Sequence, residues 1–157
     1  MKSTYEWDDS LLTLNESIDS DHRCIFEMGR EIEAAVHGLD TGRQLRLVHQ
    51  LLSYVNTHFK MEESMMREHQ YERSREHSER HRQLEEGLQI LLSNLMKLSG
   101  RVSSDEWRKF TESFVRSLVL HIKSEDKLLA QFLRQVNLEA VRSRIAGTED
   151  NRGAQEV

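Results

Sequence analysis

Residues 77–98, with the sequence HSERHRQLEEGLQILLSNLMKL, carry the clearest helical stripe in the chain. Steps of four and three residues alternate along it, and such steps place side chains on one face of an α-helix. The stripe consists of His77, His81, Leu84, Leu88, Leu91, Leu95 and Leu98. Gly100 follows, where the helix is expected to end. This stretch therefore predicts an amphipathic helix whose apolar face begins with two imidazoles.

Three other stretches repeat the helical spacing, separated by short polar or glycine-containing breaks. They run from Ile18 to Val36, from Leu45 to Met66 and from Trp107 to Phe132. The chain has no proline, which also favours helices over a sheet-rich fold. We predict an all-α fold, an antiparallel up-down four-helix bundle with helices near 18–38, 43–67, 72–99 and 105–135. Ser103, Ser104 and Asp105 are N-cap candidates for the last helix.

The segments outside the four helices divide the chain into a bundle with an N-terminal arm (1–136) and a short C-terminal extension (137–157). The arm, Tyr5 to Ser17, is expected to pack across the bundle, because its apolar residues are unfavourable in water. These are Trp7, Leu11, Leu12 and Leu14. In the extension, Leu138 to Ala146 is expected to form a short extra helix, and Gly147 to Val157 a mobile tail.

Composition argues against several functions. The net charge of −5 comes from intermixed acidic and basic residues, so no basic face can track nucleic acid. No apolar run approaches the ~18 residues needed for a membrane span, and the first ten residues lack the apolar core of a signal peptide. We therefore expect a cytoplasmic protein without nucleic-acid or membrane partners. Cys24 is the only cysteine, which excludes an internal disulfide, and we interpret it as a half-buried helix residue.

Histidines interrupt the apolar stripes, and most stand near another potential metal ligand. His58 and Glu62 are four residues apart, as are His77 and His81, so each pair can direct two donors to one interior point. His22 lies on the inner stripe of the first predicted helix. His121 and Asp126 lie near the middle of the fourth. Four helices would thus direct ligands to the same place.

Each of these fragments is weak evidence alone. The H-x-x-x-E spacing also occurs at His81/Glu85 and His121/Glu125, and a single buried histidine is more often a hydrogen-bonded core residue. However, burying five imidazoles and two carboxylates costs several kcal/mol per charged group unless a partner offsets it. A metal centre is the simplest partner. The remaining histidines, His37, His49 and His69, have no such neighbour and are assigned to solvent or loops.

The ligand set indicates the metal. Imidazole and carboxylate donors without thiolate suit iron or another first-row ion, and seven donors are too many for one ion. Two octahedral ions that share both carboxylates and one solvent-derived oxygen would have eleven of their twelve positions filled. The open position can accept an exogenous ligand such as dioxygen.

The fourth predicted helix offers two candidates for its carboxylate ligand, Glu125 and Asp126. In a regular α-helix Glu125 lies about 40° from His121 around the helix axis, whereas Asp126 lies about 140° away. A π-type turn, which contains one extra residue, would instead bring Asp126 onto the face of His121. Apolar residues further along fit both phases, so spacing alone does not choose.

Over residues from about 5 to 133 the sequence resembles the hemerythrin family, and specifically its bacterial single-domain members. The matching elements are Trp7, IDSDH ending at His22, HFKMEE from His58, HSERH from His77 and HIKSED from His121 to Asp126. Glu72 stands where many bacterial members have proline, which concerns the turn before the third helix and not the metal.

The resemblance implies how the ligands are shared between two iron ions joined by an oxo or hydroxo bridge. His77, His81 and His121 would bind one iron, His22 and His58 the other, and Glu62 and Asp126 would bridge them. The open position would lie on the His22/His58 iron, where O2 binds reversibly as a hydroperoxide. The resemblance also selects Asp126 over Glu125 and so predicts the π-type turn.

The apolar residues one helical step from these ligands are expected to line an O2 pocket and keep water away. They are Ile25, Phe59, Leu118 and Ile122. Ordinary core packing explains each of them equally well.

The expected function is non-enzymatic: carriage, storage or supply of O2. Three alternatives stay open at this point. The first is an O2 or redox sensor, in which the irons alter how the first helix or the arm meets a partner. The second is a di-iron protein that repairs iron centres or handles nitric oxide or peroxide. The third is a structural bundle with incidental histidines.

Overall fold

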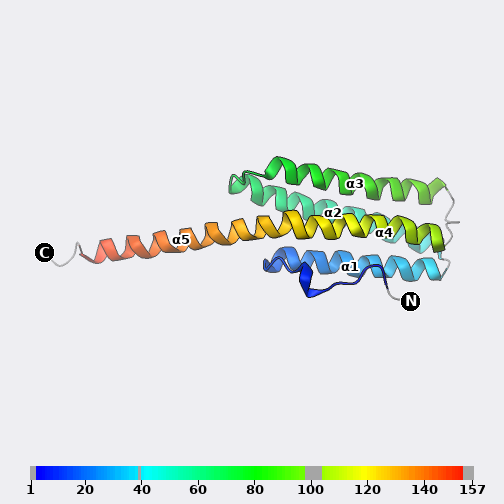
Figure 1. Ribbon diagram of the computed structural model, residues 1–157, viewed down its shortest axis with the longest axis horizontal. Helices are drawn as coiled ribbons and strands as arrows, with labels where there is room; N and C mark the ends of the chain where they lie inside the picture. The colour runs from blue at the N-terminus through cyan, green and yellow to red at the C-terminus, as the bar shows by residue number, and fades with distance from the viewer. Residues whose placement is uncertain (1–2, 39, 98–103, 154–157) are drawn as a thin grey trace.

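The stripe that starts at His77 forms a helix, as its spacing predicts, and it is one of four antiparallel helical rods (Figure 1). The computed structural model describes residues 3–38, 40–97 and 104–153 and contains no strand within these ranges. Its main helices are α1 (Glu16–His37), α2 (Thr41–Glu68), α3 (Ser74–Lys97) and α4 (Ser104–His121). The predicted all-α, four-helix bundle is confirmed. The expected roles of Leu98, Gly100 and Ser103 lie outside the described residues.

The fourth rod is longer than the others. After α4 it passes through a π-helical turn, η2 (Ile122–Asp126), and continues as α5 (Lys127–Gly153). Figure 1 shows α5 projecting beyond the bundle. Leu138–Ala146 is therefore a continuation of this rod and not a separate helix. The physical reason is that residues 104–146 contain neither glycine nor proline to end it.

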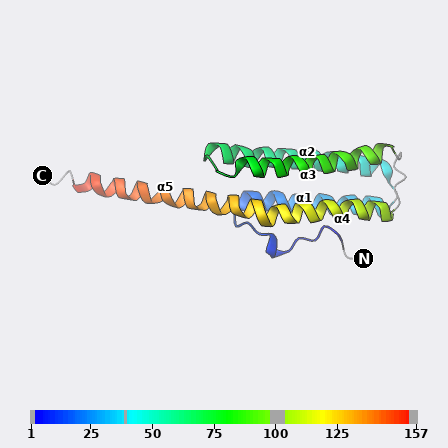
Figure 2. The ribbon, with the colours of Figure 1, turned by 45° about the horizontal axis from the view of Figure 1, so that its top comes forward.

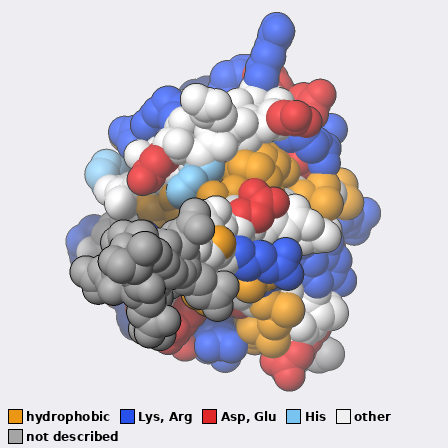
Figure 3. Space-filling view, turned by 90° about the vertical axis from the view of Figure 1, so that its left-hand side faces the viewer, with side chains coloured by type: hydrophobic (Ala, Val, Ile, Leu, Met, Phe, Trp, Pro, Cys, Tyr) orange, Lys and Arg blue, Asp and Glu red, His pale blue; other side chains and the backbone are white. Residues whose placement is uncertain are grey.

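The expected tail is helical as far as Gly153, and its last residues, 154–157, lie outside the described ranges. No break in the helix marks the expected boundary at 136/137, and that domain division stays a prediction. Viewed from the end at which α5 projects, hydrophobic side chains are visible between charged ones (Figure 3). No helix in the described ranges combines the length and apolarity required to cross a bilayer.

Two apolar clusters lie along the bundle, and the predicted ligands lie between them. In Figure 2, α2 and α3 form one layer and α1 and α4 the other. The larger cluster runs from Val48 to Phe59 on α2 and from Trp107 to Ile122 on the fourth rod. The smaller one consists of Met66, Tyr71, Leu129 and Leu133. Burial of these apolar surfaces provides the main stabilisation and sets the depth at which the polar residues lie.

The N-terminal arm packs across the bundle, as predicted, and contains a short 3-10 helix, η1 (Asp9–Leu11). Its Tyr5 and Leu11 are 1% and 2% exposed. Arg134 on α5 donates a hydrogen bond to the Thr13 carbonyl (2.7 Å), which fixes the arm against the fourth rod.

Leu14 in the arm differs from expectation. It is 70% exposed and has a left-handed φ of 65°. The buried Asp19 carboxylate accepts hydrogen bonds from the Thr13 and Leu14 backbone amides, at 2.8 and 3.1 Å. These bonds hold the turn into α1 in a shape that directs the Leu14 side chain into solvent.

Gly29 on α1 is where the arm approaches the bundle most closely, because a Cβ at this position would overlap the Tyr5 ring. We expect Gly29→Ala to lower the free energy of unfolding by about 1–2 kcal/mol, since overpacking outweighs the gain in helix propensity. Urea unfolding measures this. Gly87→Ala on α3 is the matched control: nothing lies within 4 Å of its Cβ position, so it should stabilise the protein by about 1 kcal/mol. Two variants of equal stability would contradict the prediction.

Candidate metal centre

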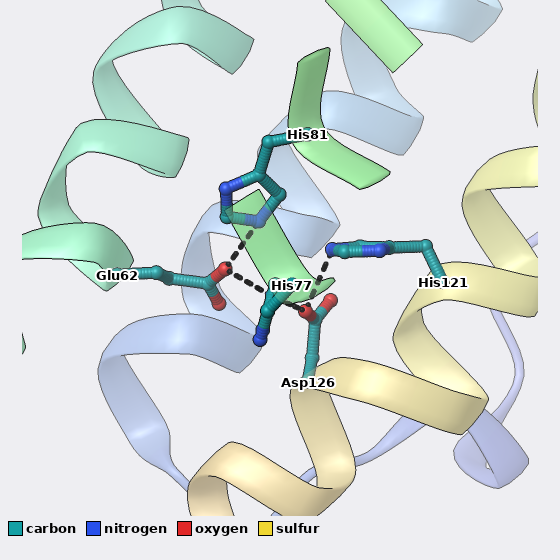
Figure 4. Close-up of side chains that lie close together, drawn as sticks. All are labelled: Glu62, His77, His81, His121 and Asp126. Carbon is teal, nitrogen blue, oxygen red and sulfur yellow. Dashed lines mark hydrogen bonds and ion pairs between the residues drawn. The ribbon is translucent and has the colours of Figure 1, made fainter. Parts of the chain in front are cut away.

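The seven predicted ligand side chains meet in the interior of the bundle. They come from all four rods and all are buried, with no more than 4% exposure. Their donor atoms form two groups, in each of which the atoms lie within 4.8 Å of one another. One group is Glu62, His77, His81, His121 and Asp126, shown in Figure 4; the other is His22, His58 and Glu62.

Asp126 faces both groups of histidines. Its Oδ1 lies 2.9 Å from Nε2 of His121 and 3.0 Å from Nε2 of His77. Its Oδ2 lies 3.1 Å from Nε2 of His22, on the other side. Each oxygen of this carboxylate therefore serves a different group.

Glu62 divides its oxygens in the same way. Its Oε2 lies 3.1 Å from Nε2 of His81 and 3.4 Å from Nε2 of His77. Its Oε1 lies 3.6 Å from Nε2 of His58. Two carboxylates thus connect the three-histidine group to the two-histidine group, and this arrangement is suited to bridging two cations.

The π-helical turn explains why Asp126 takes part and Glu125 does not. Residues 122–126 form the wide turn that we predicted between His121 and Asp126, so a residue five positions after His121 comes onto its face. Asp126 is fully buried, whereas Glu125 points toward Arg73, with its Oε2 3.4 Å from Nη2. The predicted π-type turn is confirmed. Asp126, and not Glu125, lies among the histidines, and its role as a metal ligand stays a prediction.

The donor set has unmet polar requirements that a cation can satisfy. Nε2 of His22, His58, His77 and His121 is buried without a hydrogen bond, although each lies at ion-pair distance from a carboxylate. Both Asp126 oxygens are also buried without one. Buried polar atoms without partners are rare and costly. Imidazole nitrogens and carboxylate oxygens that converge in this way fit first-row transition metal ions.

Without metal, protons on the histidines would balance the carboxylates. Burial and the neighbouring Asp126 carboxylate both raise the pKa of Glu62, but its close contacts with His77 and His81 outweigh them and bring it to about 2. Burial lowers the pKa of His77, but its close contacts with the Asp126 and Glu62 carboxylates raise it to about 9. Burial raises the pKa of Asp126, yet attraction to His121 and close contacts with His22 and His77 hold this pKa well below its usual range. The two carboxylates therefore stay ionised, and protonated histidine offsets their charge where no metal is bound.

Two carboxylates that we did not predict contact the outer sides of the histidines, and a tyrosine contacts one of these carboxylates. Asp21 Oδ2 lies 3.2 Å from Nδ1 of His58, and the Tyr54 hydroxyl donates to Asp21 Oδ1 at 2.8 Å. Glu63 Oε1 lies 3.1 Å from Nδ1 of His81. Both carboxylates are next to a predicted ligand in sequence: Asp21 precedes His22 in IDSDH, and Glu63 follows Glu62 in HFKMEE. This adjacency is the signal that could have found them.

The four residues expected to line an O2 pocket all belong to the larger apolar cluster. Ile25, Phe59, Leu118 and Ile122 are at most 2% exposed. The Phe59 ring stacks on His81, with centroids 3.9 Å apart and planes 6° from parallel. Their role toward dioxygen stays a prediction.

Aromatic and histidine residues elsewhere complete the surroundings of the site. Trp7 from the arm lies beside His22, with ring centroids 6.4 Å apart. His37 and His49 are exposed and His69 is half-buried at the end of α2, so none of them joins the centre. Cys24 is half-buried and carries a free thiol.

Comparison with known proteins agrees with this geometry. Residues 13–133 match the family model described as "Hemerythrin HHE cation binding domain". Proteins named bacteriohemerythrin from Pseudomonas aeruginosa and Pseudomonas paraeruginosa are each 26% identical over 141 residues, covering 90% of this chain and 89% of the relative. The matched span contains every predicted ligand.

Proposed function

Because this chain belongs to the hemerythrin family, we propose that it binds two iron ions in its buried centre and binds dioxygen reversibly, without catalysing a reaction. The observation that carries the proposal is the division of both carboxylates between two groups of histidines. A single ion would not need this arrangement. The physiological role that we propose is carriage, storage or supply of O2.

The residues take different parts in this proposal. His77, His81 and His121 hold one ion, His22 and His58 hold the other, and Glu62 and Asp126 bridge them. A ferrous pair would supply two electrons to dioxygen. Since the second ion has only two histidines, it is the one with room for an added ligand.

In this proposal, apolar residues beside the centre limit its contact with water. Ile25, Phe59, Leu118 and Ile122 belong to the larger apolar cluster, and Trp7 lies beside His22. A dry site limits proton supply and so disfavours irreversible loss of reduced oxygen.

Anaerobic reconstitution tests the proposal. The metal-free protein is loaded with ferrous iron, its iron content is measured, and optical spectra are recorded through cycles of air and oxygen removal. We expect two irons per chain and a visible band that forms and disappears reversibly. One iron or none would contradict the di-iron assignment. Rapid irreversible oxidation would favour the alternative of a di-iron protein that handles nitric oxide or peroxide, or repairs iron centres.

Histidine variants test the division between the two ions. We expect His22→Ala and His58→Ala to abolish most of the oxygen adduct, because they remove half of the imidazoles from the ion with the open position. His77→Ala, His81→Ala and His121→Ala should mainly weaken retention of the other ion. Adduct yield and iron content are measured on each reconstituted variant. Equal adduct yields in all five would refute the division.

A further inference from the structure

We propose that Asp21 and Tyr54 form a positioning pair that fixes the tautomer and ring orientation of His58, and that Glu63 fixes the ring orientation of His81. This inference rests on the proposed di-iron function. At each of the two metal positions, one histidine contacts a carboxylate near the bundle surface through its outer nitrogen, Nδ1. These are positioning residues, since none of them reaches the metal positions.

The contacts around His58 leave little freedom to its ring. The two sides of the ring face different carboxylates: Nδ1 lies 3.2 Å from Asp21 Oδ2, and Nε2 lies 3.6 Å from Glu62 Oε1. Only the Nδ1 contact is a hydrogen bond, since Nε2 has no hydrogen-bond partner. A carboxylate only accepts hydrogen bonds, so Nδ1 carries the hydrogen, and the Nε2 lone pair is then directed into the centre.

Asp21 is itself held in place. Its second oxygen, Oδ1, accepts the hydrogen bond from the Tyr54 hydroxyl at 2.8 Å, so both of its oxygens are engaged. Asp21 lies on α1 and both partners lie on α2, so the pair also connects two helices at the level of the site. The Asp21 side chain is 26% exposed, which places it at the edge of the bundle.

Glu63 forms the corresponding contact on the other side. It lies on α2, 3.1 Å from Nδ1 of His81 on α3, and is 30% exposed. Nε2 of His81 lies equally close to Oε2 of Glu62, at 3.1 Å, so Glu63 holds the ring in place without selecting its tautomer. His58 and His81 belong to different donor groups. The other three predicted histidine ligands, His22, His77 and His121, have a buried Nδ1 without a hydrogen-bond partner. No hydrogen bond at Nδ1 orients those three rings in the described structure.

This arrangement has a consequence for each metal position. An outer hydrogen bond selects the tautomer that can bind metal and removes ring motions that would compete with binding, and loss of such a bond typically weakens metal affinity by about 10–100-fold. Loss of Asp21 should therefore loosen the His22/His58 ion, and loss of Glu63 the three-histidine ion.

The first experiment measures the tautomer in metal-free protein, by two-bond ¹H–¹⁵N correlation of the imidazoles at pH 8. The wild-type protein should show His58 with its hydrogen on Nδ1. Asp21→Ala should give a mixture of tautomers, while Asp21→Asn should restore the Nδ1–H form, because the amide oxygen still accepts. Glu27→Ala, an exposed carboxylate on the same helix, is the matched control and should leave the signal unchanged.

The second experiment measures release of zinc, a diamagnetic probe, to an excess of chelator. We expect Asp21→Ala to release the His22/His58 ion at least about tenfold faster, and Glu63→Ala to release the three-histidine ion at least about tenfold faster. The NMR signals of the imidazoles that lose their metal identify which ion has left. Tyr54→Phe keeps the ring packing and should accelerate release of the His22/His58 ion only, by a smaller factor than Asp21→Ala.

The outcomes separate this inference from the proposed function. A single His58 tautomer in Asp21→Ala, together with unchanged zinc release, would overturn the positioning role even if two irons bind. Failure of Asp21→Asn to restore the tautomer would also overturn it, since charge and not hydrogen-bond geometry would then matter. If the wild-type protein binds no metal, the proposed function fails, and the tautomer measurement still decides whether Asp21 positions His58.

Discussion

Removal of the metal should lower the melting temperature by on the order of 20 °C. Two sites, each with free metal at about 1,000 times its dissociation constant, would together contribute roughly 8 kcal/mol, and in a chain of this length each kcal/mol shifts the melting temperature by about 2–4 °C. The physical reason is that the empty centre buries two carboxylates and five imidazoles without a cation to pair with them. Calorimetry of metal-loaded and metal-free protein at one pH measures the difference. A metal-free form that melts no lower would contradict the prediction.

The metal-free form should also depend on pH in a defined direction. The folded pKa of His77, about 9, is above the usual 6.5, so its stabilising effect is complete below pH 6.5 and is lost as the pH rises through 9. The folded pKa of Glu62, about 2, is below the usual 4.5, so its effect is present above pH 4.5 and is lost as the pH falls toward 2. Each loss amounts to about 3 kcal/mol.

Chemical unfolding of metal-free protein across these two pH windows tests both signs. The metal-loaded protein is the control, because bound metal takes the place of the His77 proton and should remove the loss at alkaline pH. Stability of the metal-free form that rises between pH 6.5 and 9 would contradict the assignment.

Replacing Asp126 by asparagine should be the most damaging single change at the centre. We expect a loss of about 3–5 kcal/mol, typical of breaking a buried ionic pair by removing one partner, and a loss of at least one metal ion. Asp126 has no exposure and lies within 3.1 Å of His22, His77 and His121, so its charge cannot be replaced by water. Chemical unfolding and metal analysis measure the two effects.

Glu125→Gln is the matched control. It changes the neighbouring carboxylate, which is buried but pairs with Arg73 at the edge of the bundle, so the cost should stay well below that of Asp126→Asn and both ions should bind. If Glu125→Gln lost metal and Asp126→Asn did not, the register of the π-helical turn would be wrong.

Much of this protein follows from spacing alone. The alternating steps of four and three from His77 to Leu91 predict a helix, because helical periodicity depends on local geometry. The pairs His58/Glu62 and His77/His81 are placed on one face for the same reason. Burial of so many polar groups then requires a common partner, so the metal centre is predictable from the order and spacing of the residues.

Other features could not be obtained from local spacing. Apolar residues after Asp126 fit two helical phases, and packing resolves them: Leu129 is fully buried and Leu128 is 40% exposed. The predicted fourth rod is too short. Beyond Phe132 the sequence is only weakly amphipathic, so its pattern indicates a short separate helix and not a continuation of the rod. The predicted burial of Leu14 is wrong, because the hydrogen bonds of Asp19 override its preference for burial.

Asp21 and Glu63, which contact the outer nitrogens of two histidines, show most clearly what helical spacing cannot predict. Helical spacing relates residues within one helix, so it places each imidazole on an inner face and sets the order of the ligands along the chain. Asp21 contacts His58 from a different helix, 37 residues away in sequence, and Glu63 contacts His81 across another helix pair. Such contacts depend on how the helices are rotated and shifted against one another, which is set by the packing of the whole core.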